Sequence, residues 1–451
     1  MKKIAAILHN KDVMNRILFT FAIFLIFRMG SAITIPGVTV SDSAFSSSDT
    51  LSLMNMLGGG ALQSFSLFAL GVSPYITAQI IVQLLQMDVL PVSPCLADLA
   101  KQGETGRKKI DMTTRYLTLV LAAVQAYGII VTMQNTQGLV VNDTSVYGYI
   151  KIVVFMTAGS MLLMWLGDQI TSKGIGNGIS MLIFAGIVSS LPNQIYLAFQ
   201  QYLGEKILSQ DASLILEGTV QLALYILAFA AIIIFVTFIE KSERRLPVSH
   251  SASSQSLSDQ QNKSSFLPIK INSSGVIPVI FASSLMMAPS IIIGLFSSGT
   301  TPEWCQTIIK VFNYQTMVAM PTADGGTWYM PWGLIIYLVL IIAFTFFYSN
   351  LQINPEKLAE DFQTNGTYIT GLRPGTETEK YIKKILNRVT FLGAMALTFI
   401  ACLPVALSLS GLVPQSLALG GTGLIIVVGV ALETYNQIDG LLAGKDYSRV
   451  V

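Results

Sequence analysis

Side chains that usually carry catalysis or hold metals are few and scattered along this chain of 451 residues. The only histidines are His9 and His250, and neither lies at a zinc-ligand spacing from a cysteine or from the other. No paired aspartates, Ser/His pairing or HExxH sequence indicates a hydrolase. We therefore expect no catalytic residue, no metal site and no cofactor, and interpret the protein as a non-enzyme.

Two weaker signals for chemistry have simpler explanations. The run from Gly174 to Gly178 is similar to a phosphate-binding loop, but a hydrophobic segment follows it and no strand precedes it. On the topology described below, Cys95, Cys305 and Cys402 fall in a cytosolic loop, an external loop and a helix, which predicts no disulfide framework. Because no Walker sequence is present, energy for any active process would come from a partner.

The composition is that of an integral membrane protein. Hydrophobic residues make up 52% of the chain, charged residues only 12%, and the mean hydropathy is +0.61. Soluble domains carry about 25% charged residues, so this chain could not cover a soluble surface.

Ten apolar segments could cross a bilayer, whose core of about 30 Å needs roughly 20 apolar residues per helix. They run near 16–35, 72–87, 116–133, 149–167, 178–196, 218–239, 276–296, 332–348, 389–408 and 417–432. The second and the last are shorter than a full span, which suits broken or tilted helices. The first is interpreted as a helix and not as a signal peptide, because its apolar run is too long and contains Arg28.

Basic residues set the orientation of these spans. With the N-terminus in the cytosol, 23 of the 27 basic residues fall on the cytosolic side, and only Lys206 and Lys310 on the other. Ten spans then return the C-terminus to the cytosol. Two long cytosolic loops, 240–275 and 349–388, could be docking surfaces or plain solvated linkers; the first is Ser/Gln-rich from 249 to 265.

A short internal repeat relates the two halves of the chain. Gly71–Ile76 opens the second span and Gly275–Ile280 opens the seventh, both with the pattern Gly-Val-x-Pro-x-Ile. Halves of five spans would lie inverted in the membrane, and inverted repeats with broken helices place a translocation path at their interface. Backbone groups freed by proline are tolerated at membrane depth only inside protein or beside a wet cavity.

The uncharged segment 51–70 precedes the second span and is too polar for a comfortable lipid-facing helix. We expect a short helix hinged by Gly58, Gly59 and Gly60 and folded into a cavity, since glycine permits large backbone changes. The alternative is an external amphipathic helix.

Carboxylates are missing from the middle of the spans: Asp168, Glu240 and Glu433 all fall at helix ends. This disfavours a secondary transporter for a small solute, the alternative function, because coupled transporters generally need a titratable group near the midplane. Apolar pairs four residues apart share helix faces instead, and they would gate a pore by dewetting if their helices surrounded one. These pairs are Ile76 with Ile80, Ile183 with Ile187, and Val276 with Ile280.

Several runs are similar to the SecY family, the channel subunits of the bacterial general secretory translocon. The matching stretches are Ser66–Ile80, Lys101–Arg107, Gly174–Ser180, Ile271–Pro278, Gly371–Gly375 and Gly420–Thr422. The resemblance implies an all-α polytopic membrane protein with ten transmembrane helices, arranged as two inverted five-helix halves, 1–196 and 197–451, around a central pore. It implies a plug near 52–68 and a sideways opening to lipid between spans 2–3 and 7–8.

The resemblance also implies sites and partners. It places a pore ring at the three apolar pairs and adds Ile426, and it assigns partner docking to Arg244, Arg245 and Arg373. The expected partners are SecE, the SecA motor ATPase, a translating ribosome, signal peptides, nascent polypeptides and membrane lipid, with SecG left open. The expected location is the plasma membrane, with both termini cytosolic.

Overall fold

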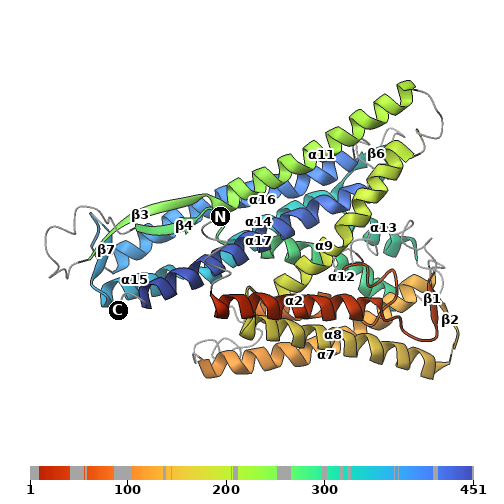
Figure 1. Ribbon diagram of the computed structural model, residues 1–451, viewed down its shortest axis with the longest axis horizontal. Coiled ribbons are helices and arrows are strands. Elements are labelled where there is room, and N and C mark those ends of the chain that lie inside the picture. Colours follow the sequence, from red (N-terminus) through yellow and green to blue (C-terminus); the bar gives the residue numbers. More distant parts are fainter. Residues whose placement is uncertain are drawn as a thin grey trace.

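The protein is an elongated bundle of helices that run broadly along one axis (Figure 1). The computed structural model describes residues 10–40, 55, 58–85, 104–135, 139–143, 145–204, 206, 212–250, 266–296, 302–314, 318–321, 327–369, 371–373, 375–409 and 415–448. Cys95, most of the Ser/Gln-rich stretch and the first residues of the expected plug lie outside these ranges.

The first five long helices come from the N-terminal part of the chain. They are α2 (Lys11–Ala32), α5 (Ser73–Leu85), α7 (Glu104–Asn135), α8 (Val146–Lys173) and α9 (Gly178–Phe199). Side-chain caps explain where two of them begin: Ser145 accepts a hydrogen bond from the Gly148 amide, and Asn177 accepts one from the Ile179 amide. A π-helical turn, η1 (Gln200–Gly204), follows α9.

The other five come from the C-terminal part. They are α11 (Ala212–Lys241), α12 (Ile277–Phe296), α14 (Trp332–Gln352), α16 (Thr376–Leu409) and α17 (Gln415–Ser448). Within the described ranges, eight helices are long and apolar enough to cross a membrane, and Ser73–Leu85 and Ile277–Ile293 are shorter apolar helices. The prediction of ten spans is confirmed by this set.

Three spans differ most in length from the prediction. The last span is not short, because α17 continues as one helix of 34 residues. α7 and α16 begin at Glu104 and Thr376, well before the predicted starts at residues 116 and 389. Hydropathy detects only the apolar part of a helix, so the charged turns that project beyond the bilayer were assigned to loops.

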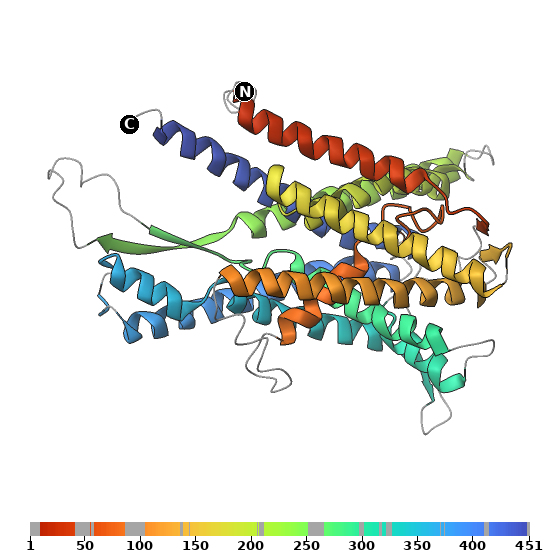
Figure 2. The same cartoon turned by 90° about the horizontal axis from the view of Figure 1, so that it is seen from below.

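The long loops are structured where the chain is described. β3 (Glu243–His250) pairs with β4 (Phe266–Lys270) and with β7 (Thr367–Ile369) in a three-stranded antiparallel sheet. α15 (Pro355–Thr364) lies beside it. The start of α2 and the end of α17 lie towards this same end of the molecule (Figure 2). We call it the basic end, because most lysines and arginines fall there.

Smaller elements cover the opposite end. β1 (Val38–Val40) pairs with β2 (Leu139–Val141), and β5 (Val318–Pro321) pairs with β6 (Thr327–Met330). Within the segment predicted as an external loop, Cys305 belongs to the helix α13 (Glu303–Phe312) and is buried. Its apolar neighbours in an amphipathic helix account for that burial.

Candidate functional site

The two sets of five helices meet along two lines. α12 lies against α5 and α7, and we call this contact the front seam. α17 lies against α9, and we call this contact the back seam.

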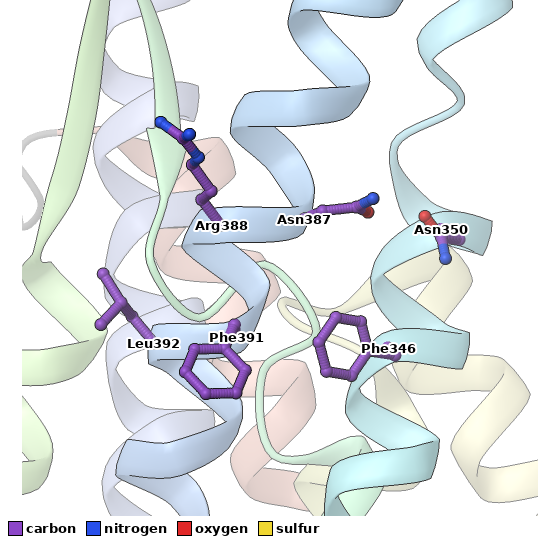
Figure 3. Close-up of a pocket in the computed structure, with 6 residues that line it drawn as sticks. All are labelled: Phe346, Asn350, Asn387, Arg388, Phe391 and Leu392. Atoms are coloured by element: carbon purple, nitrogen blue, oxygen red, sulfur yellow. The ribbon is translucent and has the colours of Figure 1, made fainter.

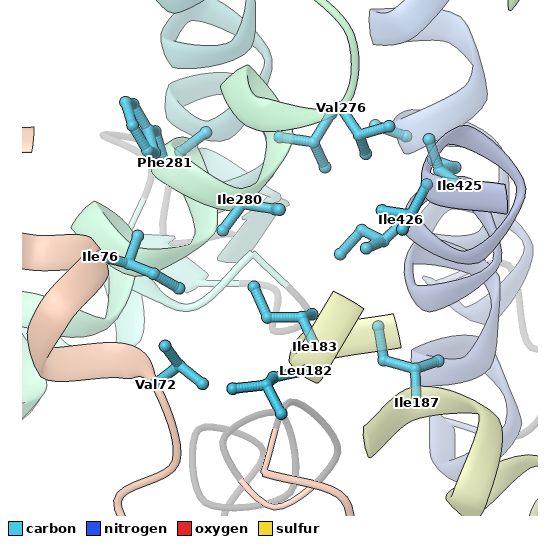
Figure 4. Close-up of a cluster of buried hydrophobic side chains, with 14 of the residues drawn as sticks. Val72, Ile76, Leu182, Ile183, Ile187, Val276, Ile280, Phe281, Ile425 and Ile426 are labelled. Carbon is cyan, nitrogen blue, oxygen red and sulfur yellow. The ribbon is translucent and has the colours of Figure 1, made fainter. Parts of the chain in front are cut away.

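Seven apolar side chains meet where the two seams enclose the middle of the bundle, and we call them the central cluster. They are Ile76, Ile80, Ile183, Ile187, Val276, Ile280 and Ile426. None is more than 6% exposed, although they come from α5, α9, the entry to α12, and α17. Figure 4 shows Ile76, Ile183, Ile280 and Ile426 pointing towards one another from these different elements. All seven residues assigned to a pore ring belong to one larger core of buried apolar residues.

The internal repeat builds matching entries to two of these helices. Gly71 and Gly275 both have left-handed backbone conformations, with φ of +60° and +63°. The valine after each glycine, Val72 or Val276, is buried in the same core. A proline then occupies the first turn of α5 and of α12, where a missing backbone N–H leaves no hydrogen bond unmade.

A polar network at the basic end fixes the entry to α12. Asn272 donates from Nδ2 to a Glu240 carboxylate oxygen at 2.6 Å and to the Gly275 carbonyl at 3.0 Å. Ser274 donates to the Asn272 side-chain oxygen at 3.1 Å. The turn that carries Val276 is therefore tied to the end of α11. Sequence reasoning missed this pair; Asn272 within the matching stretch Ile271–Pro278 was the only signal.

The glycine-rich segment is largely buried where the structure describes it. Asn55 is helical, and residues 51–54, 56 and 57 of the expected short helix lie outside the described residues. Residues 58 to 72 form consecutive turns, in which Gly59 and Gly60 have φ of +69° and +84°. Left-handed residues interrupt helical hydrogen bonding, so no helix forms between Gly58 and the start of α5. Ala61, Leu62 and Phe65 are nearly inaccessible.

This segment is held in place by α2 and α9. The Gly59 carbonyl accepts a hydrogen bond from Arg28 Nη1 at 3.3 Å and lies 3.5 Å from Ser189 Oγ. A Cβ added at Gly59 would come within 2.8 Å of Gly186 Cα, so only glycine permits this approach. Arg28 of α2 thus contacts the segment directly.

The three arginines assigned to docking all lie at the basic end, but their surroundings differ. Arg245 pairs with Glu243 at 2.8 Å and its guanidinium lies 4.7 Å from the centre of the Phe266 ring. Arg244 and Arg373 are exposed, and neither guanidinium has a hydrogen bond or ion pair within the described part of the chain. The Thr378 hydroxyl donates to the Arg373 carbonyl at 2.8 Å, which fixes the backbone of that loop against α16.

Ten apolar helices, two seams and a buried apolar cluster beside a glycine-rich segment define a multi-pass membrane protein built around a closed central path. The family model for SecY matches residues 66–435. A protein translocase subunit SecY from Lactobacillus kefiranofaciens is 42% identical over 442 residues, covering 97% of this chain and 96% of the relative.

Solved structures agree on the fold. A solved structure of a protein conducting channel is similar to this chain, with a TM-score of 0.64 and 18% sequence identity. The similarity covers 94% of this chain and 91% of that channel. Sec61 in a canine ribosome-channel complex gives a TM-score of 0.62 at 18% identity, with the same coverage. The chain belongs to the SecY family. It is therefore a protein-conducting channel subunit of a translocase, and the small-solute transporter is not favoured.

Proposed function

We propose that unfolded secretory polypeptides cross the membrane through the central cluster and that transmembrane segments leave sideways through the front seam. One observation carries this proposal: seven apolar side chains from four separate elements meet in the middle of a membrane-spanning bundle. An apolar constriction excludes water and ions when closed and grips no particular substrate sequence. That suits a channel that must admit many different polypeptides.

The segment near 52–68 acts as the plug in this proposal. In the closed state the plug is held by Arg28 and by close contact of Gly59 with α9. Displacement of the glycines breaks the Arg28 and Ser189 contacts to Gly59. Displacement of the residues that follow them also breaks hydrogen bonds to the end of α2 and the residues after it, among them Ser64 Oγ to the Ser31 carbonyl and the Leu67 amide to the Ile33 carbonyl. Gly58, Gly59 and Gly60 provide the hinge. The halves 1–196 and 197–451 move relative to each other as the front seam opens.

Site-specific photocrosslinking tests the path. A photoreactive amino acid at Ile183 should crosslink to a precursor arrested during translocation, because this side chain lies in the central cluster. The same group at Leu227, which is 70% exposed on α11, should crosslink to lipid and not to the precursor. Equal precursor crosslinking at both positions would remove the central cluster as the path.

The basic end is proposed to face the cytosol, with both termini on that side of the plasma membrane. The positive-inside bias of the basic residues supports this orientation. A membrane-impermeant thiol reagent should reach a cysteine at Glu356 only from the cytosol and one at Thr307 only from outside. Reversed labelling would overturn the assignment.

Partners supply the energy and the clients in this proposal, and the channel subunit performs no chemistry of its own. SecE is expected as a constitutive partner, SecG stays open, and the SecA motor or a translating ribosome would dock at the basic end. A canine relative of this fold was solved in a ribosome complex, which supports a ribosome as one partner. Arg373 and Arg244 offer free guanidinium forks for carboxylates or phosphates, whereas Arg245 is already engaged.

Arg373 gives the sharpest test of docking. Arg373→Glu should stop SecA-dependent translocation into reconstituted vesicles while leaving expression and membrane insertion intact. Arg373→Lys should be only partly active, because lysine keeps the positive charge but lacks the planar guanidinium that forms two parallel hydrogen bonds. Lys357→Glu, on the exposed face of α15, is the matched charge control. Wild-type rates for Arg373→Glu would exclude a docking role.

A further inference from the structure

A groove opens on the outside of the bundle between the last turns of α14 and the middle of α16 (Figure 3). Its volume is about 650 Å³. The lining residues are Phe346, Asn350, Asn387, Arg388, Phe391 and Leu392. The groove lies well away from the central cluster, and the translocation path makes no use of it.

The groove has a polar part and an apolar part. Asn350, Asn387 and Arg388 line the part nearer the basic end, and the two phenylalanines and the leucine line the rest. Phe391 and Leu392 are 54% and 59% exposed although both belong to a membrane-spanning segment. Side chains exposed at such positions face hydrocarbon. The apolar part of the groove is therefore open to lipid.

Arg388 lies where the apolar part of α16 ends. Its guanidinium has no hydrogen bond or ion pair to any other described residue. Lys380 and Lys384 precede it at four-residue intervals, so the three cations occupy one face of α16 and are all exposed. An unpaired cation beside hydrocarbon needs a counter-charge, and the phosphates of anionic lipid lie at that depth.

We propose that this groove binds one anionic phospholipid. Arg388 holds the phosphate, the side-chain amides of Asn350 and Asn387 donate to headgroup oxygens, and an acyl chain lies along Phe346, Phe391 and Leu392. Charge complementarity favours a lipid over a partner protein's helix, because the polar part supplies donors around one cation and the apolar part continues directly into the bilayer. The bound lipid would hold α14 to α16 at the basic end.

Fluorescence quenching in nanodiscs tests the proposal on the full-length channel. Phe391→Trp places a reporter in the groove, and the parent protein supplies the background from its four native tryptophans. Phosphatidylglycerol brominated on its acyl chains should quench this reporter with about fivefold higher apparent affinity than brominated phosphatidylcholine, the ratio that one cationic contact supports. Adding Arg388→Gln should bring the ratio to about one, whereas adding Lys357→Gln should leave it unchanged.

The other outcomes overturn the proposal. Equal quenching by both lipids would mean that the groove does not select a charged headgroup. No quenching by either lipid, in a channel copurified with its partners, would mean that a protein covers the groove. Loss of quenching on adding inorganic phosphate would mean that the site binds phosphate and not lipid. Native mass spectrometry of unlabelled protein, counting retained phosphatidylglycerol with and without Arg388→Gln, repeats the test if Phe391→Trp folds poorly.

Discussion

Across the back seam, the Gly176 amide donates to the side-chain oxygen of Gln437 at 2.9 Å, and the Thr434 hydroxyl lies 3.3 Å from the sulfur of Met181. Across the front seam, no hydrogen bond joins a described residue of α5 or α7 to one of α12, although these helices pack closely. Both seams are apolar, so burial stabilises both. Only the back seam adds directional contacts that are lost as soon as its helices move apart.

Buried polar groups without a partner occur on helices of both seams. Gln83 on α5 and Gln125 on α7 each carry a buried side-chain oxygen that accepts no hydrogen bond in the described structure. An unpaired buried acceptor costs about 1–3 kcal/mol, and that cost disappears when water or a partner reaches it. Two helices of the front seam thus carry such a group, and α9 of the back seam carries one at Gln194. The hydrogen bonds across the back seam therefore favour the front seam as the moving side and the back seam as the hinge.

The largest effect is expected from a substitution that disrupts the contact between the plug and α9, a helix of the back seam. Gly59→Ala should expel the plug and raise ion leak strongly, because a methyl group would clash with the Gly186 backbone in addition to left-handed strain of about 1–2 kcal/mol. Gly60→Ala carries the same backbone strain but meets no atom within 4 Å, so its leak should rise much less. Planar-bilayer conductance checks both. Equal leak from the two variants would show that contact with α9 does not hold the plug.

Ile280→Asn acts on the moving side of the central cluster. A polar side chain favours wetting of the constriction, and a barrier lowered by about 1.4 kcal/mol would raise conductance about tenfold. Leu285→Asn, on the 41% exposed face of the same helix, is the control and should leave conductance unchanged. Normal expression with wild-type conductance for Ile280→Asn would mean that this residue only packs.

Gln125→Leu should have the opposite effect and make the front seam harder to open. Replacing the unpaired amide with a side chain of similar size removes a buried polar group and should stabilise the closed state by about 1 kcal/mol. Slower opening should appear as a rate of precursor insertion about fivefold lower, with less basal leak. An unchanged or faster rate would show that this glutamine does not oppose closure.

Gln437→Ala should have the smallest effect. It removes the acceptor for the Gly176 amide, and because this hydrogen bond is exposed, we expect a loss of about 0.5 kcal/mol. Thermal unfolding in detergent should shift slightly downwards, while insertion rates stay near wild type. A large gain in leak would mean that the back seam also gates the channel.

Sequence reasoning was most successful where a local pattern decides the structure. The matching Gly-Val-x-Pro entries at Gly71 and Gly275 did build matching turns, because glycine conformation and proline position act within a few residues. It failed for the sheet at the basic end. Pro247 and Pro268 both lie inside paired strands, where proline is normally excluded, so no strand was predicted there.

Long-range partners could not be predicted either. Arg28 with Gly59 and Glu240 with Asn272 are separated by 31 and 32 residues, and their contacts depend on how whole helices pack. The apolar pairs that contain Ile76, Ile183 and Ile280 also depend on helix packing. Four-residue spacing placed each pair on one face of its helix, but only the packing of three helices brings the pairs together.

Distance measurements between paired spin labels test the difference between the seams most directly. In a background without the three native cysteines, labels at Val120 and Leu285 report on the front seam, and labels at Val188 and Tyr435 report on the back seam. Each position is at least 37% exposed, so a label should be tolerated. We expect an arrested precursor to lengthen the front distance and to leave the back distance unchanged. A lengthened back distance, or a front distance that stays fixed while the precursor is engaged, would contradict the account.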